Sequence, residues 1–330
     1  MKALRLAAAL TGLGALLACP TARASFPLEP TSDDVPVAHR TSGALALLES
    51  AAAAAQARTW TGTERVLSLV TGAPVVSVAT SNHGPGAHSA TDALDARLFS
   101  LLAQHYELRV TGSAWCAGHL TRVVEAVRTG VTRRVAARFW LDRGSGLLLR
   151  RDVMDRKGAL LRRNELLSMT SGLVSTSAPS APPSARGRHL EDAALARLER
   201  AGWPVLRALP GHLDLYEARW LPDGALQLAY SDGLSTLSLF VQPGQREPVA
   251  AGVVRRVGGG SVWEAPGDPE RAVWSAEGRT WTLVSDAEPA VVQEVLETLP
   301  HVAADEPGDG VAPRVWRGMS RVGAWMNPFR

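Results

Sequence analysis

Cysteine is nearly absent from this chain, which has only Cys19 and Cys116 in 330 residues. We expect Cys19 to be removed with an N-terminal export segment, and the remaining thiol then has no partner for an intramolecular disulfide. Metal sites built from several cysteines are excluded for the same reason. A lone cysteine is more often a small buried hydrophobic residue than a reactive thiol, so we expect Cys116 to lie in the core.

Long apolar runs are lacking after the first 24 residues, whereas a membrane-spanning helix needs about 20 apolar residues. Within that first segment, Lys2 and Arg5 precede an apolar run over residues 6–17, and Ala22-Arg-Ala24 stands directly before Ser25. This order is typical of a secretory signal cleaved between Ala24 and Ser25. Removing the segment lowers the formal net charge from +3 to 0, because it contains three basic residues and no acid.

A second interpretation of the export segment stays open. Leu16-Leu-Ala-Cys19 resembles a lipobox, in which the cysteine is lipidated and becomes the new N-terminus. Cleavage at Ala24 is favoured because Pro20 directly follows the cysteine. We therefore expect a periplasmic or extracytoplasmic protein, with a lipoprotein anchored at Cys19 as the alternative.

Sequence signatures of catalysis are missing too. The chain has no Gly-x-Ser-x-Gly motif, no His-Glu-x-x-His motif and no phosphate-binding glycine loop that leads into a helix. His83 and His88 share a loop rich in glycine and proline, but no third ligand stands near them, which favours a surface loop over a metal site. We expect a binding protein and not an enzyme, with no cofactor, no metal and no nucleic-acid partner.

Hydrophobic periodicity divides the first half of the mature chain into helices and short strands. Residues 25–42 lack periodicity and predict a loose arm, after which Ser42 is expected to cap a helix. Regularly spaced strands separated by glycine-bearing turns then predict an antiparallel meander. We expect helices at residues 43–57 and 91–105, a hairpin at 60–70 and 75–79, and strands at 106–111, 119–128, 132–142, 147–155 and 160–169.

Residues 174–188 are rich in proline, serine and alanine and have little to bury, so we expect a linker there. The sequence after the linker predicts a helix over 190–201, seven strands between 213 and 285, and a closing helix over 289–299. Asp232-Gly233 and Glu277-Gly278 are expected to be two-residue hairpin connections. Both halves of the chain therefore predict an α+β fold.

Basic residues are concentrated in residues 128–163, which have eleven of them against three acids, a net charge of +8. Such a segment attracts anionic headgroups or an acidic partner, with a solvated outer sheet face as the alternative. Residues 311–330 contain four arginines, no acid and several large apolar residues. A peripheral membrane contact and an unstructured tail both stay open for this end.

Two passages resemble the MucB/RseB family of sigma-factor regulatory proteins. In residues 139–158, a Phe139-Trp-Leu-Asp142 strand end leads through a leucine-rich strand to an Asp155-Arg-Lys-Gly158 turn. The second passage, Tyr230-Ser-Asp-Gly-Leu234, is similar to the family's hairpin in the C-terminal domain. A weaker match to a strand of the family is Cys116-Ala-Gly-His119 together with the strand that follows it. Each passage is a folding element, and none is a catalytic signature.

The resemblance implies an N-terminal domain like that of the lipoprotein carrier LolA, an unclosed antiparallel β-barrel with helices in its concavity, followed by a smaller antiparallel α/β domain. Such a half-barrel accepts acyl chains when it leaves an apolar cavity. The same side chains in a filled core would give the same sequence pattern. Candidates to line the cavity are Trp60, Val66, Val135, Phe139, Leu147 and Leu149.

The resemblance further implies a regulator of an envelope-stress sigma factor. It would bind the ectodomain of a membrane-anchored anti-sigma factor, protect it from proteolysis and release it on an acyl-lipid or lipopolysaccharide-like signal. The partner-binding candidates are Tyr230, Asp232, Gly233 and Leu234. The alternative is an exported lipid or lipoprotein carrier or sensor without an anti-sigma partner, and homo-oligomerisation stays open.

The sequence thus predicts six consecutive regions. They are a signal peptide (1–24), an N-terminal arm (25–42), a LolA-like domain (43–173), a linker (174–188), a partner-binding domain (189–300) and a basic aromatic tail (301–330).

Overall fold

The computed structural model describes helices, strands and turns between Val37 and His301. No helix among the described residues is long and apolar enough to cross a membrane. The predicted signal segment with its cleavage between Ala24 and Ser25, the alternative anchor Cys19, the first part of the arm, and the tail beyond His301 lie outside the described residues. The described residues are 37–70, 74–83, 96–171, 187–244, 252–265, 267 and 269–301.

Helix α1 (Val37–Ala57) begins earlier than the sequence predicted. Ser42 lies inside the helix, so its prediction as the N-terminal cap is wrong. The segment between Val37 and Ser42 contains no proline or glycine, and hydrophobic periodicity underestimated the helix because its first turns carry few apolar residues. The buried residues follow the spacing of one helix face, and they are Ala44, Leu48, Ala51 and Ala55.

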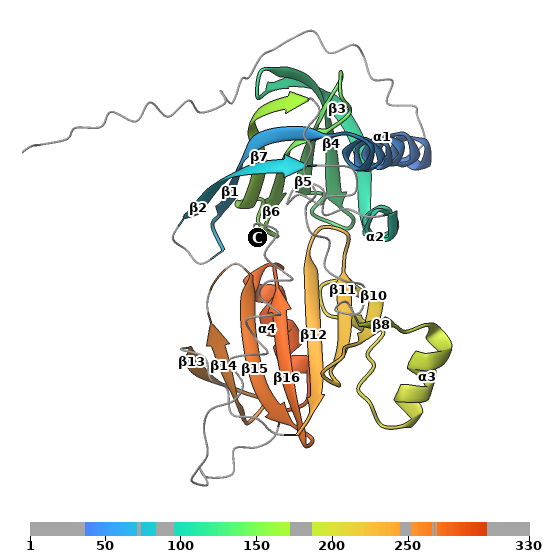
Figure 1. Cartoon of the computed structure of the whole chain (residues 1–330), viewed down its shortest axis with the longest axis vertical. Helices are drawn as coiled ribbons and strands as arrows, with labels where there is room; N and C mark the ends of the chain where they lie inside the picture. The colour runs from blue at the N-terminus through green and yellow to red at the C-terminus, as the bar shows by residue number, and fades with distance from the viewer. Residues whose placement is uncertain are drawn as a thin grey trace, which may run out of the picture. The chain divides into compact units, whose positions relative to one another are not determined.

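The first sheet contains seven antiparallel strands in the order β2-β1-β7-β6-β5-β4-β3 (Figure 1). The predicted hairpin and meander are confirmed, although β3 is longer than expected because a bulge at Gly112 lets it continue. The strands are β1 (Trp60–Ser68), β2 (Val75–His83), β3 (Tyr106–Cys116), β4 (His119–Arg128), β5 (Val135–Asp142), β6 (Leu148–Met154) and β7 (Leu160–Ser171).

The first sheet does not close into a barrel, because β2 and β3 are its two edges and do not pair with each other. Helices α1 and α2 (Ala96–His105) pack on the sheet and on each other. Buried side chains from both helices and from β3, β4, β5 and β6 form one hydrophobic cluster. This open sheet with helices on one face confirms the predicted fold class.

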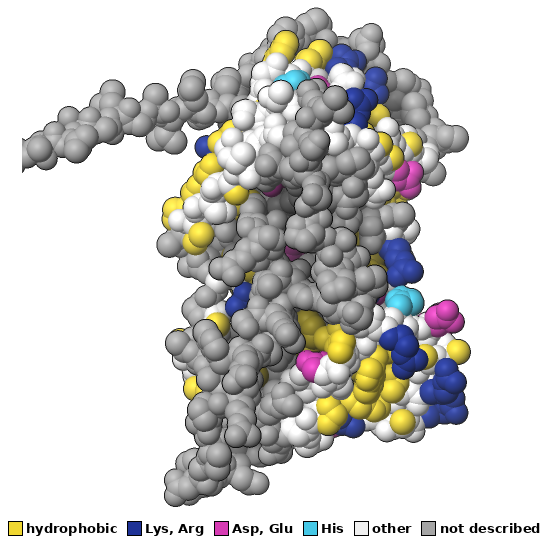
Figure 2. All heavy atoms as spheres, viewed as in Figure 1, with side chains coloured by type: hydrophobic (Ala, Val, Ile, Leu, Met, Phe, Trp, Pro, Cys, Tyr) yellow, Lys and Arg dark blue, Asp and Glu magenta, His cyan; other side chains and the backbone are white. Residues whose placement is uncertain are grey.

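Strand β2 leaves an apolar edge. Val75, Val76 and Val78 are 54%, 56% and 58% exposed, and hydrophobic side chains are visible over this strand in Figure 2. Since valines on both faces of the strand are exposed, β2 contributes little to the core.

The second sheet is also antiparallel, in the order β13-β14-β15-β16-β12-β11-β10-β8, with β9 paired to β10. Helix α3 (Asp192–Arg200) contributes Leu195 to the core beside this sheet. The strands are β8 (Arg188–His189), β9 (Ala208–Leu209), β10 (Leu213–Trp220), β11 (Leu226–Ser231), β12 (Thr236–Pro243), β13 (Val253–Val257), β14 (Gly260–Ala265), β15 (Glu270–Ala276) and β16 (Arg279–Ser285).

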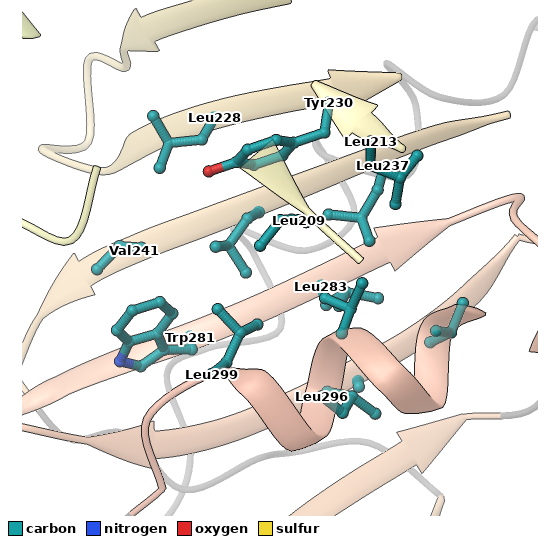
Figure 3. Close-up of a cluster of buried hydrophobic side chains, with 14 of the residues drawn as sticks. Leu209, Leu213, Leu228, Tyr230, Leu237, Val241, Trp281, Leu283, Leu296 and Leu299 are labelled. Atoms are coloured by element: carbon teal, nitrogen blue, oxygen red, sulfur yellow. The ribbon is translucent and has the colours of Figure 1, made fainter. Parts of the chain in front are cut away.

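Helix α4 (Pro289–Thr298) covers the core of the second sheet, as the apolar stripe in its sequence predicted (Figure 3). Proline stands in its first turn, where a missing N–H does no harm. Trp274 and Trp281 stack with ring centroids 5.7 Å apart beneath it, and both are fully buried. The Trp274 indole N–H donates to the carbonyl of Pro300, 2.9 Å away, which holds the end of α4.

One hairpin connection in the second sheet was predicted correctly and the other was not. Ala276 pairs with Arg279, so Glu277-Gly278 is the expected two-residue turn, with both residues at positive φ. Between β11 and β12, however, Ser231 pairs with Thr236, so four residues, 232–235, form the connection. The Asp232 carboxylate accepts hydrogen bonds from the amides of Leu234 and Ser235, which stabilises this longer turn.

All described residues belong to one compact unit. Most of the predicted linker lies outside the described residues, which stop at residue 171 and resume at 187. The division into two domains therefore stays a prediction.

Candidate functional site

The outer face of the first sheet holds a ladder of alternating charges. Glu125 on β4 lies between Arg109 on β3 and Arg138 on β5, with N···O distances of 2.8 and 2.7 Å. Asp152 on β6 accepts from Arg150 and Arg163 at 2.6 and 2.8 Å. The sheet register places Glu125 opposite both of its arginines and Asp152 opposite Arg163, and directly opposed residues share a face. Arg150 shares that face because it lies two residues before Asp152 on the same strand.

Acids outside the ladder also neutralise part of the basic segment. Arg156 pairs with Glu294 at 2.7 Å, and Arg162 with Asp286 at 3.3 Å. Both acids lie more than 120 residues away along the chain, so the local charge count could not include them. The net charge of +8 therefore overstates the attraction of this face for anionic surfaces.

Trp140 lies on the ladder face of β5, where its aromatic ring has charged neighbours. The guanidinium of Arg150 lies over its ring at 4.3 Å from the centroid. This contact stabilises the ring on a polar face, because a cation over the face of an indole is attracted by the ring electrons.

The six residues predicted to line a lipid cavity lie on the first sheet but not around one pocket. Trp60, Leu147 and Leu149 belong to one buried cluster, which also contains Cys116. Phe139 belongs to another cluster, the one that helices α1 and α2 cover. Val66 and Val135 are half-buried, and none of the six borders the pocket described below. The expected burial of Cys116, which is 3% exposed, is confirmed.

The predicted partner-binding residues are buried. Tyr230 lies inside the core of the second sheet, where its hydroxyl donates to the carbonyl of Leu206 at 2.9 Å (Figure 3). Burial raises its pKa above the usual value, because the phenolate would lose its hydration. Asp232 and Leu234 are 8% and 4% exposed. As arranged here, these side chains present little surface to a partner.

The connection 232–235, which we call the hairpin tip, packs against the first sheet. The Tyr106 hydroxyl donates to Asp232 Oδ2 at 2.5 Å. Leu234 belongs to the hydrophobic cluster that contains Phe139 and Leu102. A Cβ atom on Gly233 would stand 2.3 Å from the backbone nitrogen of Leu102, so only glycine fits this close approach.

A pocket of about 370 Å³ borders the hairpin tip. Its volume is at the lower end of the range of roughly 300–1,000 Å³ typical of small-molecule sites. Both signs of charge line it, through Arg128 and Arg156 and through Asp232 and Glu288. Arg128 is held in place by donating to the carbonyls of Met154 and Asp155, each at 3.0 Å. The pocket is suited to a polar ligand group.

Two histidines line the same pocket, and the sequence gave no sign of their contact. His105 Nε2 lies 2.8 Å from Asp214 Oδ2, and its ring centroid is 5.3 Å from that of His212. His212 has a φ of 63°, a conformation that few non-glycine residues adopt. More than 100 residues separate the two histidines in sequence, so no local motif could have shown this contact.

No group of three or more metal-ligating side chains occurs among the described residues. The side chain of His83 and the whole of His88 lie outside the described part of the chain, so the predicted surface loop at these residues is not tested.

These features define a class: an α+β protein with an open, helix-covered antiparallel sheet, joined by a buried hairpin tip to a second sheet. Residues 47–184 match the family model described as the MucB/RseB N-terminal domain. These residues are therefore identified as a domain similar to the N-terminal domain of that family.

Two of the three similar proteins described here are named MucB. The sigma factor AlgU regulatory protein MucB of Pseudomonas aeruginosa is 29% identical over 151 residues, which are 44% of this chain and 46% of that protein. The match therefore spans less than half of the relative's length. A solved structure of MucB in complex with MucA(peri) is 19% identical, with a TM-score of 0.44 over 79% of this chain and all of that one. A putative outer membrane lipoprotein-sorting protein domain from Vibrio parahaemolyticus is 12% identical, with a TM-score of 0.21 over 41% of this chain and 95% of that domain.

Proposed function

We propose that this chain is an extracytoplasmic regulator of a sigma factor and acts by binding the ectodomain of a membrane-anchored anti-sigma factor. The observation that carries the proposal is the MucB/RseB N-terminal domain over residues 47–184. The relative from Pseudomonas aeruginosa is named as a regulatory protein of a sigma factor. The secretory pattern of residues 1–24 supports a location outside the cytoplasmic membrane.

Protection of the anti-sigma factor from proteolysis is the finer part of the proposal. A partner covers a cleavable segment only while it is bound, so protection must fall as the complex dissociates. An acyl lipid would release the partner if it binds the free regulator more tightly than the complex, since only differential affinity shifts an equilibrium. The contact between the hairpin tip and the first sheet is a candidate for the element that both ligands affect.

The experiment is a pull-down of the exported chain with the ectodomain of an anti-sigma factor encoded beside its gene. The same complex is then exposed to a protease that cleaves the free ectodomain. Retention together with slower cleavage supports the proposal. An ectodomain that is neither retained nor protected contradicts it.

A lipid carrier or sensor without an anti-sigma partner is the second candidate. The open sheet and the pocket of about 370 Å³ favour it, because both are suited to a small ligand. Solvent extraction of the purified exported chain, followed by mass spectrometry, tests it. Protein that carries no lipid after expression in its native envelope contradicts this candidate and leaves the first intact.

A further inference from the structure

Arg151 is a charged side chain buried in the middle of the first sheet. It lies on β6 between Phe139 on β5 and Asn164 on β7, on the face opposite the charge ladder. The residue is 8% exposed, and the guanidinium stands 6.0 Å from the centroid of the Phe139 ring. Arginine is almost never buried this deeply unless a partner compensates its charge.

The contacts of Arg151 do not compensate that charge. Its Nη2 donates to the carbonyl of Leu234 in the hairpin tip, which is a neutral acceptor. Its Nε is buried and has no hydrogen-bond partner among the described residues. A buried donor without an acceptor is unfavourable and calls for an explanation.

The two acids that act electrostatically on Arg151 are engaged elsewhere. Asp232 accepts from the Tyr106 hydroxyl and from two amides of its own turn. Asp286 pairs with Arg162 and accepts from the amide of Thr236 at 2.5 Å. Burial lowers the pKa of the Arg151 guanidinium, and Asp286 and Asp232 act on it only from a distance. The guanidinium stays protonated, because arginine does not lose its proton in proteins.

The surroundings of Arg151 are apolar on the side where Leu234 lies. Leu234 packs in the cluster of Phe139 and Leu102, between the first sheet and its helices. Leu234 also borders the pocket of about 370 Å³. Withdrawal of the hairpin tip would therefore expose a cation at the base of an apolar concavity that is continuous with an existing pocket.

We propose that Arg151 binds the acidic group of an anionic amphiphile, a carboxylate or phosphate monoester attached to an acyl chain. The acidic group takes the place of the Leu234 carbonyl, and the acyl chain takes the place of the Leu234 side chain. Ligand binding and the seated hairpin tip are then mutually exclusive. This inference rests on the lipid-release part of the proposed function and names the ligand class and the residue that selects it.

The proposal explains why an arginine stands where a hydrophobic residue would fold at least as well. Replacing a buried charge by an apolar side chain of similar volume is often neutral or stabilising. We therefore expect Arg151→Met to leave the ligand-free protein at least as stable as the wild type. A purely structural arginine would instead make that variant less stable.

The test is displacement of the neutral fluorescent probe N-phenylnaphthylamine from the exported chain by oleate, oleoyl lysophosphatidate or oleyl alcohol. Arg151→Met should lower the affinity for both acids by at least about tenfold, because one charge-assisted contact is lost. Its affinity for oleyl alcohol should stay unchanged. Arg138→Met is the matched control on the opposite face of the same sheet, and it should leave the affinities for all three compounds unchanged. Wild-type protein that binds acid and alcohol equally overturns the proposal, as does an Arg151→Met variant that keeps its preference for acids. Stronger binding of only one acid identifies the headgroup.

A second variant keeps the proposal testable if Arg151→Met does not fold. Leu234→Ala weakens the seated tip and leaves the arginine in place, so it should bind oleate more tightly than the wild type. Unchanged or weaker oleate binding by Leu234→Ala overturns the competition. If Arg151→Met loses the anti-sigma ectodomain and keeps oleate, the arginine binds a carboxylate of the protein partner and the proposal is wrong. If wild-type protein binds oleate but not the ectodomain, the proposed function fails and this inference stands.

Discussion

Gly233→Ala should detach the hairpin tip from the first sheet. Gly233 has a φ of 90°, and an added Cβ would lie 2.3, 2.4 and 2.7 Å from the backbone nitrogen, Cα and Cβ of Leu102. These atoms belong to the backbone and first side-chain carbon of a helix, so no flexible side chain can move to make room. The tip itself must withdraw.

The magnitude follows from the contacts that withdrawal breaks. Burial of Leu234 contributes about 2 kcal/mol. The hydrogen bond from Tyr106 to the Asp232 carboxylate involves a charged group and contributes about 1.5 kcal/mol or more. The lost bond from Arg151 to the Leu234 carbonyl adds little, because the uncovered guanidinium regains its hydration. With about 1 kcal/mol for alanine in a left-handed conformation, the loss in the free energy of unfolding is about 4.5 kcal/mol.

Gly278→Ala is the matched control for this prediction. Gly278 also lies in a hairpin turn, with a φ of 70°, but a Cβ there meets no atom within 4 Å. Gly278→Ala should lower the free energy of unfolding only through the left-handed conformation of alanine, which costs about 1 kcal/mol. Urea unfolding of both variants measures the difference, and equal losses would refute the close packing of the tip.

Three further predictions concern stability. Asp152→Asn removes the acid between Arg150 and Arg163 and should lower the free energy of unfolding by about 3 kcal/mol at pH 7. Burial raises the pKa of Asp152, but hydrogen bonds from both arginines outweigh it and hold that pKa below the usual value. Its contribution is therefore present above about pH 4 and lost as the pH falls through the folded pKa, so urea titrations of wild type and variant should converge at low pH; a constant difference would refute this sign. Trp281→Ala empties a fully buried site and should lower the free energy of unfolding, measured by calorimetry, by about 4 kcal/mol. A decrease below about 1 kcal/mol would contradict the described core. Glu294→Gln removes an exposed ion pair and should change unfolding by less than about 1 kcal/mol, so a larger loss would show a network that the structure lacks.

Local patterns predicted most of the secondary structure. The 119–128 strand matches β4 at both ends, and the closing helix differs from α4 by one residue. Alternation and helical periodicity are properties of neighbouring residues, so a single sequence contains them. The Glu277-Gly278 turn was predictable for the same reason, since its glycine readily adopts positive φ.

Features that depend on distant residues were not predictable. Asp232-Gly233 has the residue types of a two-residue turn, yet hydrogen bonds within the turn and the contact with Leu102 favour a longer connection. Phe139 was named as a candidate cavity residue from the sequence, but Arg151, which lies opposite it in the sheet register, was counted only as part of a basic segment. Alternation would have placed Arg151 on the inner face, and that signal was missed. The contact with Leu234, 83 residues away, has no local signal at all.

If this chain regulates a sigma factor as we propose, it must bind the ectodomain of an anti-sigma factor. Isothermal titration calorimetry of the purified exported chain with that ectodomain tests it most directly. We expect saturable heat with a dissociation constant of about 1 µM or tighter. Absence of binding heat, with both proteins folded and at concentrations well above that value, would contradict it.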